Sequence, residues 1–366
     1  MCRIAGIVSV KQTPKRLQEQ VREMCQIQQH GGPDDEGLYS HGEKGVAFGH
    51  RRLSLIDLSP GGHQPMHYGT EHLVISYNGE LYNYLSLKTD LQNLGHQFNT
   101  NSDTEVILAA FAAWGTGAFK RFAGMFAVAL LDLHKNSVYL VRDQSGIKPL
   151  YYSQQNSELY FASEARALAS VESLTTENPA WPVYFLAYGH LPEPITTLQH
   201  VQPLPKGCYL QYSLYSQVSE IHTYAHFTYI EKLDNKAAVL EQIRQGLRLS
   251  VERHLLSDAP IGAFLSGGID SSLMALLAGE SVKKKLTTLS IYFNEKSYSE
   301  KPYQELIAQK LNGNHRDYCL TENEFDVSFP AIMAAMDLPS NDGINTWFIS
   351  KYAKEAGLKA VLSGLG

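Results

Sequence analysis

The chain has 366 residues, enough for about two domains, and its 44% hydrophobic content lets each domain bury an ordinary core. A formal net charge of −6 argues against nucleic acid as a partner, and the longest apolar run, residues 125–131, is too short to span a membrane. The four cysteines lie far apart with no C-x-x-C pair, which argues against a zinc site or disulfide framework and favours a reduced, cytoplasmic setting.

The first half of the chain alternates short strand patterns with a few helices. A β-rich start at residues 4–10 is followed by Leu17, Val21 and Met24 at helical spacing after Pro14. Further strands are predicted at 46–48, 73–77, 126–133 and 138–141, and helices at 81–94 and 104–114. The second helix has Ser102 or Asp103 as its expected cap. Strands with segregated helices predict a layered α+β domain.

The pattern changes in the second half. Residues 173–205 are rich in Pro and Thr and are predicted to connect two domains. After residue 234, helices are predicted at 240–251, 271–278, 302–311 and 345–356, and strands at 261–265, 286–292 and 360–362. This alternation predicts a parallel α/β sheet. Ligand loops follow the carboxyl ends of such strands, so the sequence stops inside an expected loop and we expect a fragment.

Cys2 is a candidate nucleophile because it becomes the first residue if Met1 is removed, which its small side chain permits. Such a residue carries both a thiol that can attack and an α-amino group that can accept and return the proton. The plain alternative is a cysteine that merely begins a buried strand. Its position alone does not decide between the two.

The polar residues downstream of Cys2 suit the cleavage of a side-chain amide of an amino acid. Arg52 could hold an α-carboxylate, Glu80 and Asp103 an α-ammonium, and Asn78 with the Gly79 backbone could stabilise an oxyanion. Each has an ordinary alternative. Arg52 could form a surface ion pair, Asn78-Gly79 could be a hairpin turn, and Asp103 could be only a helix cap.

Seven collinear motifs carry a family resemblance: MCRIAG at 1–6, GPDDEG at 32–37, GHRRLS at 49–54, NGELYN at 78–83, SDTE at 102–105, RDQSGIKPLYY at 142–152 and FASE at 161–164. Together they resemble the glutaminase domain of the glutamine-hydrolysing asparagine synthetase family. The resemblance implies an N-terminal-nucleophile fold with αββα layers over residues 2–210.

The resemblance also implies roles for individual residues. Cys2 would be the nucleophile, and Asn78 and Gly79 would form the oxyanion hole. Arg52 would bind the glutamine carboxylate, while Glu80 and Asp103 would hold its amino group. The same pocket would be lined by the backbone of Leu53, Ser54, Leu55 and Ile56.

The sequence departs from this family at two positions that involve an arginine. Arg3 stands where the family usually has glycine, and Gly31 stands where it usually has arginine. One large cation is gained and one is lost. We hypothesise that the Arg3 guanidinium occupies the space that a side chain at position 31 would fill.

A second motif, SGGIDSS at 266–272, follows an apolar strand and opens a helix. Glycines let the backbone approach phosphate oxygens, and the helix N-terminus supplies oriented N–H groups. Asp270 could hold Mg²⁺. The string is not a Walker loop; it resembles the pyrophosphate loop of ATP pyrophosphatases. That likeness implies an α/β, Rossmann-like ATP domain over residues 235–366, with ATP contacts from Leu265, Ser266, Gly267, Gly268, Asp270, Ser271, Ser272, Ile291, Ser363 and Gly364.

The resemblance implies a ligase that hydrolyses glutamine, adenylates aspartate with ATP and Mg²⁺, and forms asparagine, AMP and pyrophosphate. Leu365 replaces the usual acidic residue. Another carboxylate acceptor, in surface-polysaccharide or peptide modification, therefore stays open, as does a truncated remnant without the full activity. Asp337 and Asp342 could face the acceptor or shape a turn. The expected partners are small-molecule substrates, and a homodimer also stays open.

Overall fold

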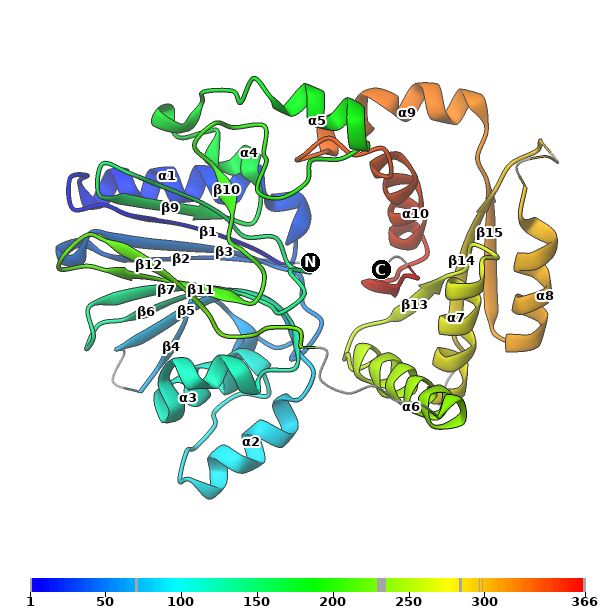
Figure 1. Ribbon diagram of the computed structural model, residues 1–366, viewed down its shortest axis with the longest axis horizontal. Helices are drawn as coiled ribbons and strands as arrows, with labels where there is room; N and C mark the ends of the chain where they lie inside the picture. The colour runs from blue at the N-terminus through cyan, green and yellow to red at the C-terminus, as the bar shows by residue number, and fades with distance from the viewer. Residues whose placement is uncertain are drawn as a thin grey trace. The chain divides into compact units, whose positions relative to one another are not determined.

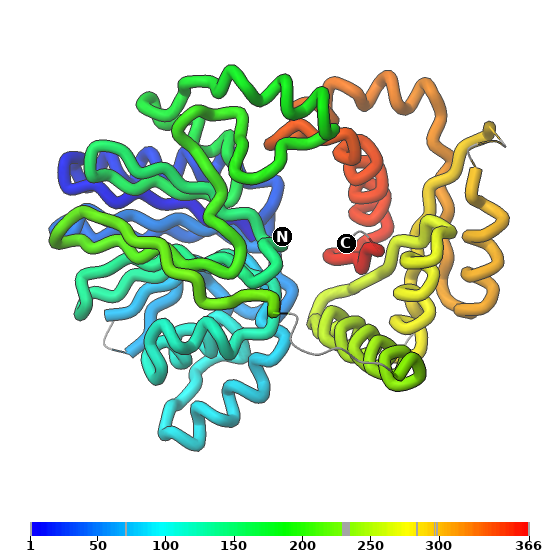
Figure 2. The backbone as a smooth tube through the Cα atoms, in the orientation of Figure 1, coloured from blue at the N-terminus to red at the C-terminus, as the bar shows by residue number. Residues whose placement is uncertain are grey.

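The computed structural model describes residues 2–69, 72–228, 235–282, 285–295, 297 and 299–364. It divides into two compact units, Met1–Thr228 with Asp337–Pro339, and Tyr229–Met336 with Ser340–Gly366. Figure 2 traces the chain through both units, from blue at the N-terminus to red. Among the described helices, none combines the length and apolar character needed to cross a membrane. The predicted domain limits at 210 and 235 stay predictions.

Two six-stranded antiparallel sheets form the centre of the first unit (Figure 1). The first sheet has the strand order β10 (Gln202–Pro203), β8 (Tyr151–Gln155), β9 (Glu158–Ala162), β1 (Arg3–Val8), β3 (Val46–Arg52) and β2 (Asp35–His41). The second sheet has the order β12 (Ser219–Thr223), β11 (Cys208–Ser213), β7 (Ser137–Arg142), β6 (Gly124–Asp132), β5 (Leu73–Leu81) and β4 (Met66–Tyr68).

Helices cover the outer faces of both sheets. Helix α1 (Pro14–Ile27) and the short α4 (Ala165–Leu168) pack on the first sheet, while α2 (Tyr84–Asn93) and α3 (Asp103–Trp114) pack on the second (Figure 1). Apolar side chains from both sheets fill the space between them, among them Ile4, Phe48 and Leu131. These αββα layers confirm the predicted fold class of the N-terminal domain.

A hydrogen bond shows which of the two candidate residues caps helix α3. The Ser102 side chain accepts a hydrogen bond from the backbone N–H of Thr104, so Ser102 is the N-cap and Asp103 is the first helical residue. Helix α1 begins in the same way, with Thr13 as the cap and Pro14 in the first turn. Local capping signals therefore place both helix starts correctly.

Several predicted boundaries were wrong. Strand β5 continues to Leu81 and α2 begins only at Tyr84, so Asn78-Gly79 lies inside a strand and not in a hairpin turn. The reason is long-range pairing, because Asn78 and Gly79 sit opposite Ala127 and Phe126 of β6. The predicted connection at 173–205 contains α5 (Trp181–Tyr188), which is apolar yet has no buried residue.

The second unit contains a four-stranded parallel sheet in the order β15 (Asn314–Cys319), β14 (Thr287–Tyr292), β13 (Ile261–Phe264) and β16 (Ala360–Leu362). Its helices are α6 (Lys236–His254), α7 (Ile269–Ser281), α8 (Lys301–Leu311), α9 (Glu322–Ala335) and α10 (Gly343–Glu355). This confirms the predicted α/β class. The prediction missed β15, a polar edge strand, and α9, which contains Pro330.

The position of Gly79 inside β5 generates a stability prediction. A Cβ at Gly79 would lie 2.3 Å from the Met125 carbonyl oxygen and 2.7 Å from the Phe126 Cα, both on the fixed backbone of β6. Gly79→Ala should therefore lower the free energy of unfolding by about 1–3 kcal/mol. Urea titration followed by circular dichroism measures this.

A matched control is Gly117→Ala, because a Cβ at Gly117 meets no atom within 4 Å. We expect that variant to unfold within about 0.5 kcal/mol of the wild type. Equal unfolding midpoints for Gly79→Ala and Gly117→Ala would contradict the placement of Gly79 against β6.

Candidate active site

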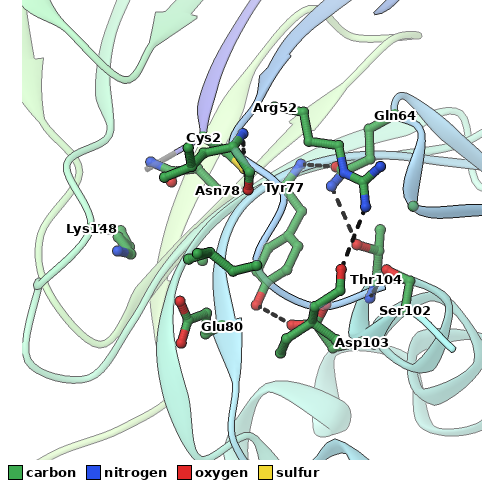
Figure 3. A pocket seen from close by; sticks show the side chains of 15 residues that line it. Cys2, Arg52, Gln64, Tyr77, Asn78, Glu80, Ser102, Asp103, Thr104 and Lys148 are labelled. Atoms are coloured by element: carbon green, nitrogen blue, oxygen red, sulfur yellow. Dashed lines mark hydrogen bonds between the residues drawn. The ribbon is translucent and has the colours of Figure 1, made fainter. Parts of the chain in front are cut away.

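A pocket lies at the ends of β1, β3 and β5, near the start of α3 (Figure 3). The structure brings together there all the predicted glutamine-site residues except Ser54, whose backbone N–H donates to Asp34 Oδ2 at 2.9 Å. The pocket is lined by Cys2, Arg52, Leu53, Leu55, Ile56, Gly62, Gln64, Tyr77, Asn78, Gly79, Glu80, Ser102, Asp103, Thr104 and Lys148.

Cys2 reaches the pocket because of strand pairing. Arg3 pairs with Arg51 across β1 and β3, which places Cys2 next to the end of β3. Its Sγ lies 3.4 Å from the Leu53 nitrogen and 3.5 Å from the Leu53 carbonyl oxygen. Burial raises the pKa of the thiol, although the Leu53 N–H and the charge of Lys148 act in the opposite direction. A protonated thiol needs a base beside it before it can attack.

Asn78 has an unused buried side-chain amide. The residue is fully buried, and neither its nitrogen nor its oxygen has a hydrogen-bond partner among the described residues. Figure 3 shows Asn78 beside Cys2. An unsatisfied buried amide is costly, so such groups in a pocket point to a ligand that supplies the missing bond. Asn78 and Gly79 are held by the ladder between β5 and β6.

Arg52 lies at the other side of the pocket in the same view, near Gln64 (Figure 3). It is only 6% exposed, so it is not a surface residue. Its guanidinium donates to the carbonyl oxygens of Ser59, at 3.0 Å, and of Asp57. The loop after β3 therefore fixes the direction of the guanidinium, as a carboxylate-binding fork requires.

Asp103 does more than start a helix. Its Oδ2 accepts hydrogen bonds from the Tyr77 hydroxyl and from the Leu81 backbone N–H, both at 2.9 Å. Burial raises the pKa of Asp103, while these two donors stabilise the charged form and act against the shift. The carboxylate is thereby tied to β5, close to Glu80.

Lys148 was missed by the sequence reasoning, although it lines the pocket and is only 1% exposed. Burial lowers the pKa of Lys148 and raises that of Glu80, while the opposite charge of each partner favours the charged form of the other. Figure 3 shows both side chains on the side of the pocket away from Arg52. The pocket thus holds two cations and two carboxyl groups.

A turn built around Asp143 positions Lys148. The Asp143 carboxylate accepts from the backbone N–H groups of Ser145 at 3.1 Å, Ile147 at 2.9 Å and Lys148 at 2.9 Å. The Arg142 side chain donates to the carbonyl oxygen of Lys148 at 3.1 Å. The sequence did contain one signal for this turn. The string from Arg142 to Gly146 is typical of a turn, and it is followed by Lys148 between the apolar residues Ile147 and Pro149.

The hypothesis about Arg3 and Gly31 is borne out by their proximity. A Cβ at Gly31 would lie 2.7 Å from Cγ and Cζ of Arg3. Arg3 Nε lies 2.5 Å from Glu164 Oε1, and the same carboxylate contacts His30 at 2.9 Å and Arg166 at 2.7 Å. Burial alone would raise the pKa of Glu164, but hydrogen bonds from His30 and the charge and bond of Arg3 lower it to about 2.

Asp337 shapes the first unit. Its carboxylate oxygens accept from the backbone N–H groups of Ala165 at 2.9 Å and Arg166 at 2.8 Å, at the start of α4. The sequence left open whether Asp337 faces the acceptor or shapes a turn. These two hydrogen bonds give it a structural role at the start of α4. Asp342 precedes α10, and its Oδ2 accepts from the Thr346 hydroxyl at 3.3 Å.

The predicted ATP loop joins β13 to α7. Gly267 has a φ of +92°, which favours glycine, and Gly268 precedes the helix without a side-chain cap from the described residues. The hydroxyls of Ser266 and Ser271 lie 2.8 Å apart, and the Ser266 N–H donates to the Ser271 hydroxyl at 3.2 Å. The serines stiffen the loop while the first N–H groups of α7 stay available for an anion.

The other predicted ATP residues gather around this loop. A Cβ at Gly364 would lie 2.9 Å from the Ser271 nitrogen, because β16 and β13 are parallel neighbours. Gln304, which the sequence reasoning missed, donates to the carbonyl oxygens of Ser266 at 3.2 Å and Ile291 at 3.0 Å. Buried Leu265 precedes the loop and exposed Ser266 begins it. Leu365 lies outside the described residues.

No group of three or more His, Cys, Asp or Glu residues with metal-binding geometry occurs among the described residues. Asp270 is exposed at the first turn of α7, next to the loop. A single carboxylate suits Mg²⁺ that is also bound by phosphate oxygens, because this ion commonly takes one or two protein carboxylates and several other oxygens. The donor set therefore fits Mg²⁺ carried by a nucleotide.

Glu164 generates a prediction about acid stability. Its pKa is about 2 in the folded protein, against an ordinary value of 4.5, so its ionised form stabilises the fold above pH 4.5. That contribution, about 2–3 kcal/mol, should be lost as the pH falls from about 5 towards 2. Urea unfolding at a series of pH values measures it.

The matched variant is Glu164→Gln, which removes the titrating group. It should be less stable than the wild type at pH 7, and its stability should fall less steeply between pH 5 and 2. Parallel curves for the two proteins would contradict the depressed pKa.

Comparisons with known proteins agree with both halves of this description. The model of the glutamine amidotransferase domain family matches residues 1–225, and that of the asparagine synthase family matches residues 242–366. The chain is 34% identical over 373 residues to glutamine-hydrolyzing asparagine synthetase 1 of Bacillus subtilis. The match covers 100% of this chain and 58% of that relative.

A second relative is the putative glutamine-hydrolyzing asparagine synthetase 2 of Methanocaldococcus jannaschii, 31% identical over 389 residues, with 100% of this chain and 74% of the relative covered. Asparagine synthetase B of Escherichia coli is 31% identical over 390 residues, with 100% and 63% covered. The chain thus spans between 58% and 74% of the length of these three relatives.

Proposed function

Because the chain belongs to the family of glutamine-hydrolysing asparagine synthetases, we propose that its first unit hydrolyses glutamine to glutamate and ammonia with Cys2 as the nucleophile. The observation that carries the proposal is the pocket. There the Cys2 thiol lies beside the Asn78 amide, which has no hydrogen-bond partner among the described residues, and Arg52, Lys148, Glu80 and Asp103 line the same space. A zwitterionic substrate with a side-chain carboxamide matches this set of groups.

The reaction begins with a proton transfer. Once Met1 is removed, the free α-amino group of Cys2 takes the thiol proton, because burial keeps the thiol protonated. The sulfur attacks the carboxamide carbon and forms a tetrahedral oxyanion. The Asn78 amide and the Gly79 N–H stabilise this oxyanion. The proton then passes to the leaving nitrogen, ammonia departs, and water hydrolyses the thioester to glutamate.

The ends of the substrate are held by the charged groups. The buried Arg52 fork binds the α-carboxylate, and its backbone anchors prevent it from turning away. Glu80 and Asp103 bind the α-ammonium. Burial raises the pKa of Glu80 to about 7, and the positive charge of Lys148 opposes this shift and so favours the charged carboxylate.

The second unit is proposed to bind ATP at the loop between β13 and α7. The asparagine synthase family, to which residues 242–366 belong, uses ATP. Phosphate oxygens would accept from the N–H groups at the start of α7, and Asp270 would hold the accompanying Mg²⁺, which neutralises phosphate charge. In the whole protein, an acceptor carboxylate, aspartate first of all, would be adenylated and then amidated by the ammonia.

The glutaminase proposal predicts distinct effects of two substitutions. Cys2→Ala should abolish glutamate release from glutamine, because no thioester can form. Asn78→Ala should lower kcat about 10²–10³-fold with a smaller effect on KM, because the lost donor acts mainly on the oxyanion. A coupled glutamate assay on the purified chain, with its N-terminus checked by mass spectrometry, measures both.

Cys319→Ala is the control, since Cys319 lies on β15 of the other unit and keeps the reactive thiol unchanged. Full activity in Cys2→Ala, or in a preparation that retains Met1, would refute the mechanism.

The ATP proposal predicts that Asp270→Ala weakens ATP binding about tenfold or more in the presence of Mg²⁺ and much less in its absence. Isothermal titration with ATP, with Mg²⁺ or with a chelator, separates the two contributions. Glu280→Ala, at the opposite end of α7, is the matched control because it removes an exposed carboxylate far along the same helix. Equal loss in both variants would contradict a role for Asp270.

A further inference from the structure

Arg3 and Gly31 share one space in the first unit. Gly31 is buried at the end of the short helical turn Gln29–Gly31 that follows α1. A Cβ placed on it would lie 2.7 Å from Arg3 Cγ and 2.8 Å from Arg3 Nε, well inside van der Waals contact. A side chain at position 31 and the observed Arg3 side chain therefore exclude each other.

Fixed partners hold Arg3 in this space. Its Nε lies 2.5 Å from Glu164 Oε1, and its Nη1 donates to the carbonyl oxygen of Cys2 at 3.1 Å. The side chains of Arg3 and Glu164 are only 16% and 5% exposed. Glu164 lies two residues after the end of β9. Between them, Ser163 joins this region to β1, because its hydroxyl accepts from the Ile4 N–H and its own N–H donates to the Ile4 carbonyl oxygen. The guanidinium is a bridge between the Cys2 backbone and the end of β9.

The bridge places a positive charge beside the first residue of the mature chain. The α-nitrogen and carbonyl oxygen of one residue lie within roughly 3.6 Å of each other, which puts the guanidinium about 7 Å or less from the α-nitrogen of Cys2. The paired Glu164 carboxylate offsets part of this charge, and the part that remains favours the neutral amine over the ammonium form. The neutral amine is the form that accepts the thiol proton.

We propose that Arg3 is a positioning residue for the nucleophile, which takes the place of a side chain at position 31 and clamps the Cys2 backbone to Glu164. This inference rests on the proposed glutaminase activity and deepens it. Arg3 does not line the pocket, so it acts through Cys2 and not on the substrate.

Other charged and titratable groups also face Cys2, and they set the background for any pH effect. They come from β1, β3, β5, the start of α3, the turn after β7 and the segment after β9, and they are Arg3 with its partner Glu164, Arg52, Tyr77, Glu80, Asp103 and Lys148. Arg3 contacts the Cys2 backbone directly, through the hydrogen bond that its Nη1 donates to the Cys2 carbonyl oxygen. Substituting Arg3 therefore changes the clamp while the remaining groups stay in place.

The test compares Arg3→Gly, Gly31→Arg and the double variant that carries both. Arg3→Gly should lower kcat about tenfold and move the acidic limb of the kcat–pH profile up by about one pH unit, with KM for glutamine nearly unchanged. Gly31→Arg should be impaired and less stable, because two guanidinium groups compete for one space. The double variant should recover both kcat and the acidic limb, since the side chain from position 31 enters the vacated space.

Thermal unfolding of the same four proteins gives a readout that does not depend on activity. The two substitutions should couple strongly, with the double variant more stable than their separate effects predict. A double variant that is no better than either single variant would overturn the shared space. An Arg3→Gly variant with wild-type kcat and pH profile, and only a lower Tm, would reduce the bridge to a structural ion pair.

If the double variant does not fold, Arg3→Lys and Arg3→Gln still test whether the charge at position 3 acts on the Cys2 amine. Lysine retains the charge and should keep the acidic limb near its wild-type position, whereas glutamine should shift it; identical profiles would refute the proposal. Arg16→Gln, on the exposed side of α1, is the control for loss of a positive charge. If the wild type shows no Cys2-dependent glutamate release, the proposed function itself fails, which is a different result.

Discussion

The register between β1 and β3 is the constraint on which the first unit depends. Residues of a strand alternate between its two faces, so a shift of one residue would exchange them all. Ile4 and Val8 join the core between the sheets, while Ala5 and Ile7 face α1. By the same alternation, Cys2 faces the pocket between the sheets and Arg3 faces the side of α1, where Gly31 and Glu164 lie. One pairing thus assigns the nucleophile and its clamp to opposite faces.

Much of this arrangement could be predicted from the sequence, where the signal is local. Pro14, as a first-turn residue, marked the start of α1, and the capping signal at Ser102 or Asp103 marked the start of α3. Alternating strands and helices marked the parallel sheet. The chemistry of Cys2, Arg52 and Asp103 was also accessible, because each residue type suits one part of an amino-acid substrate. The close approach of Arg3 to Gly31 followed from comparing two departures from a family pattern.

The errors arise where long-range contacts override local signals. Asn-Gly is a strong hairpin dipeptide, yet Asn78-Gly79 is extended because β6 supplies a partner for each residue. Lys148 was missed as a pocket residue, because the string from Arg142 to Gly146 indicates a turn but not the burial that this turn and the neighbouring strands create. Gln304 likewise acts at a loop 38 positions away in the chain.

The two candidate sites use different physical means to hold an anion or a dipole. The first buries an unpartnered amide and several ionisable groups, which costs free energy that the surrounding apolar clusters must offset. Paired strands hold Arg52, Asn78 and Glu80 in place, while the start of α3 holds Asp103 and the turn around Asp143 holds Lys148. The second site relies on backbone N–H groups at a glycine-rich helix start, where Ser266 and Asp270 are exposed. The contact between the Ser266 and Ser271 hydroxyls and the hydrogen bond from Gln304 to the Ser266 carbonyl oxygen hold this loop in its conformation.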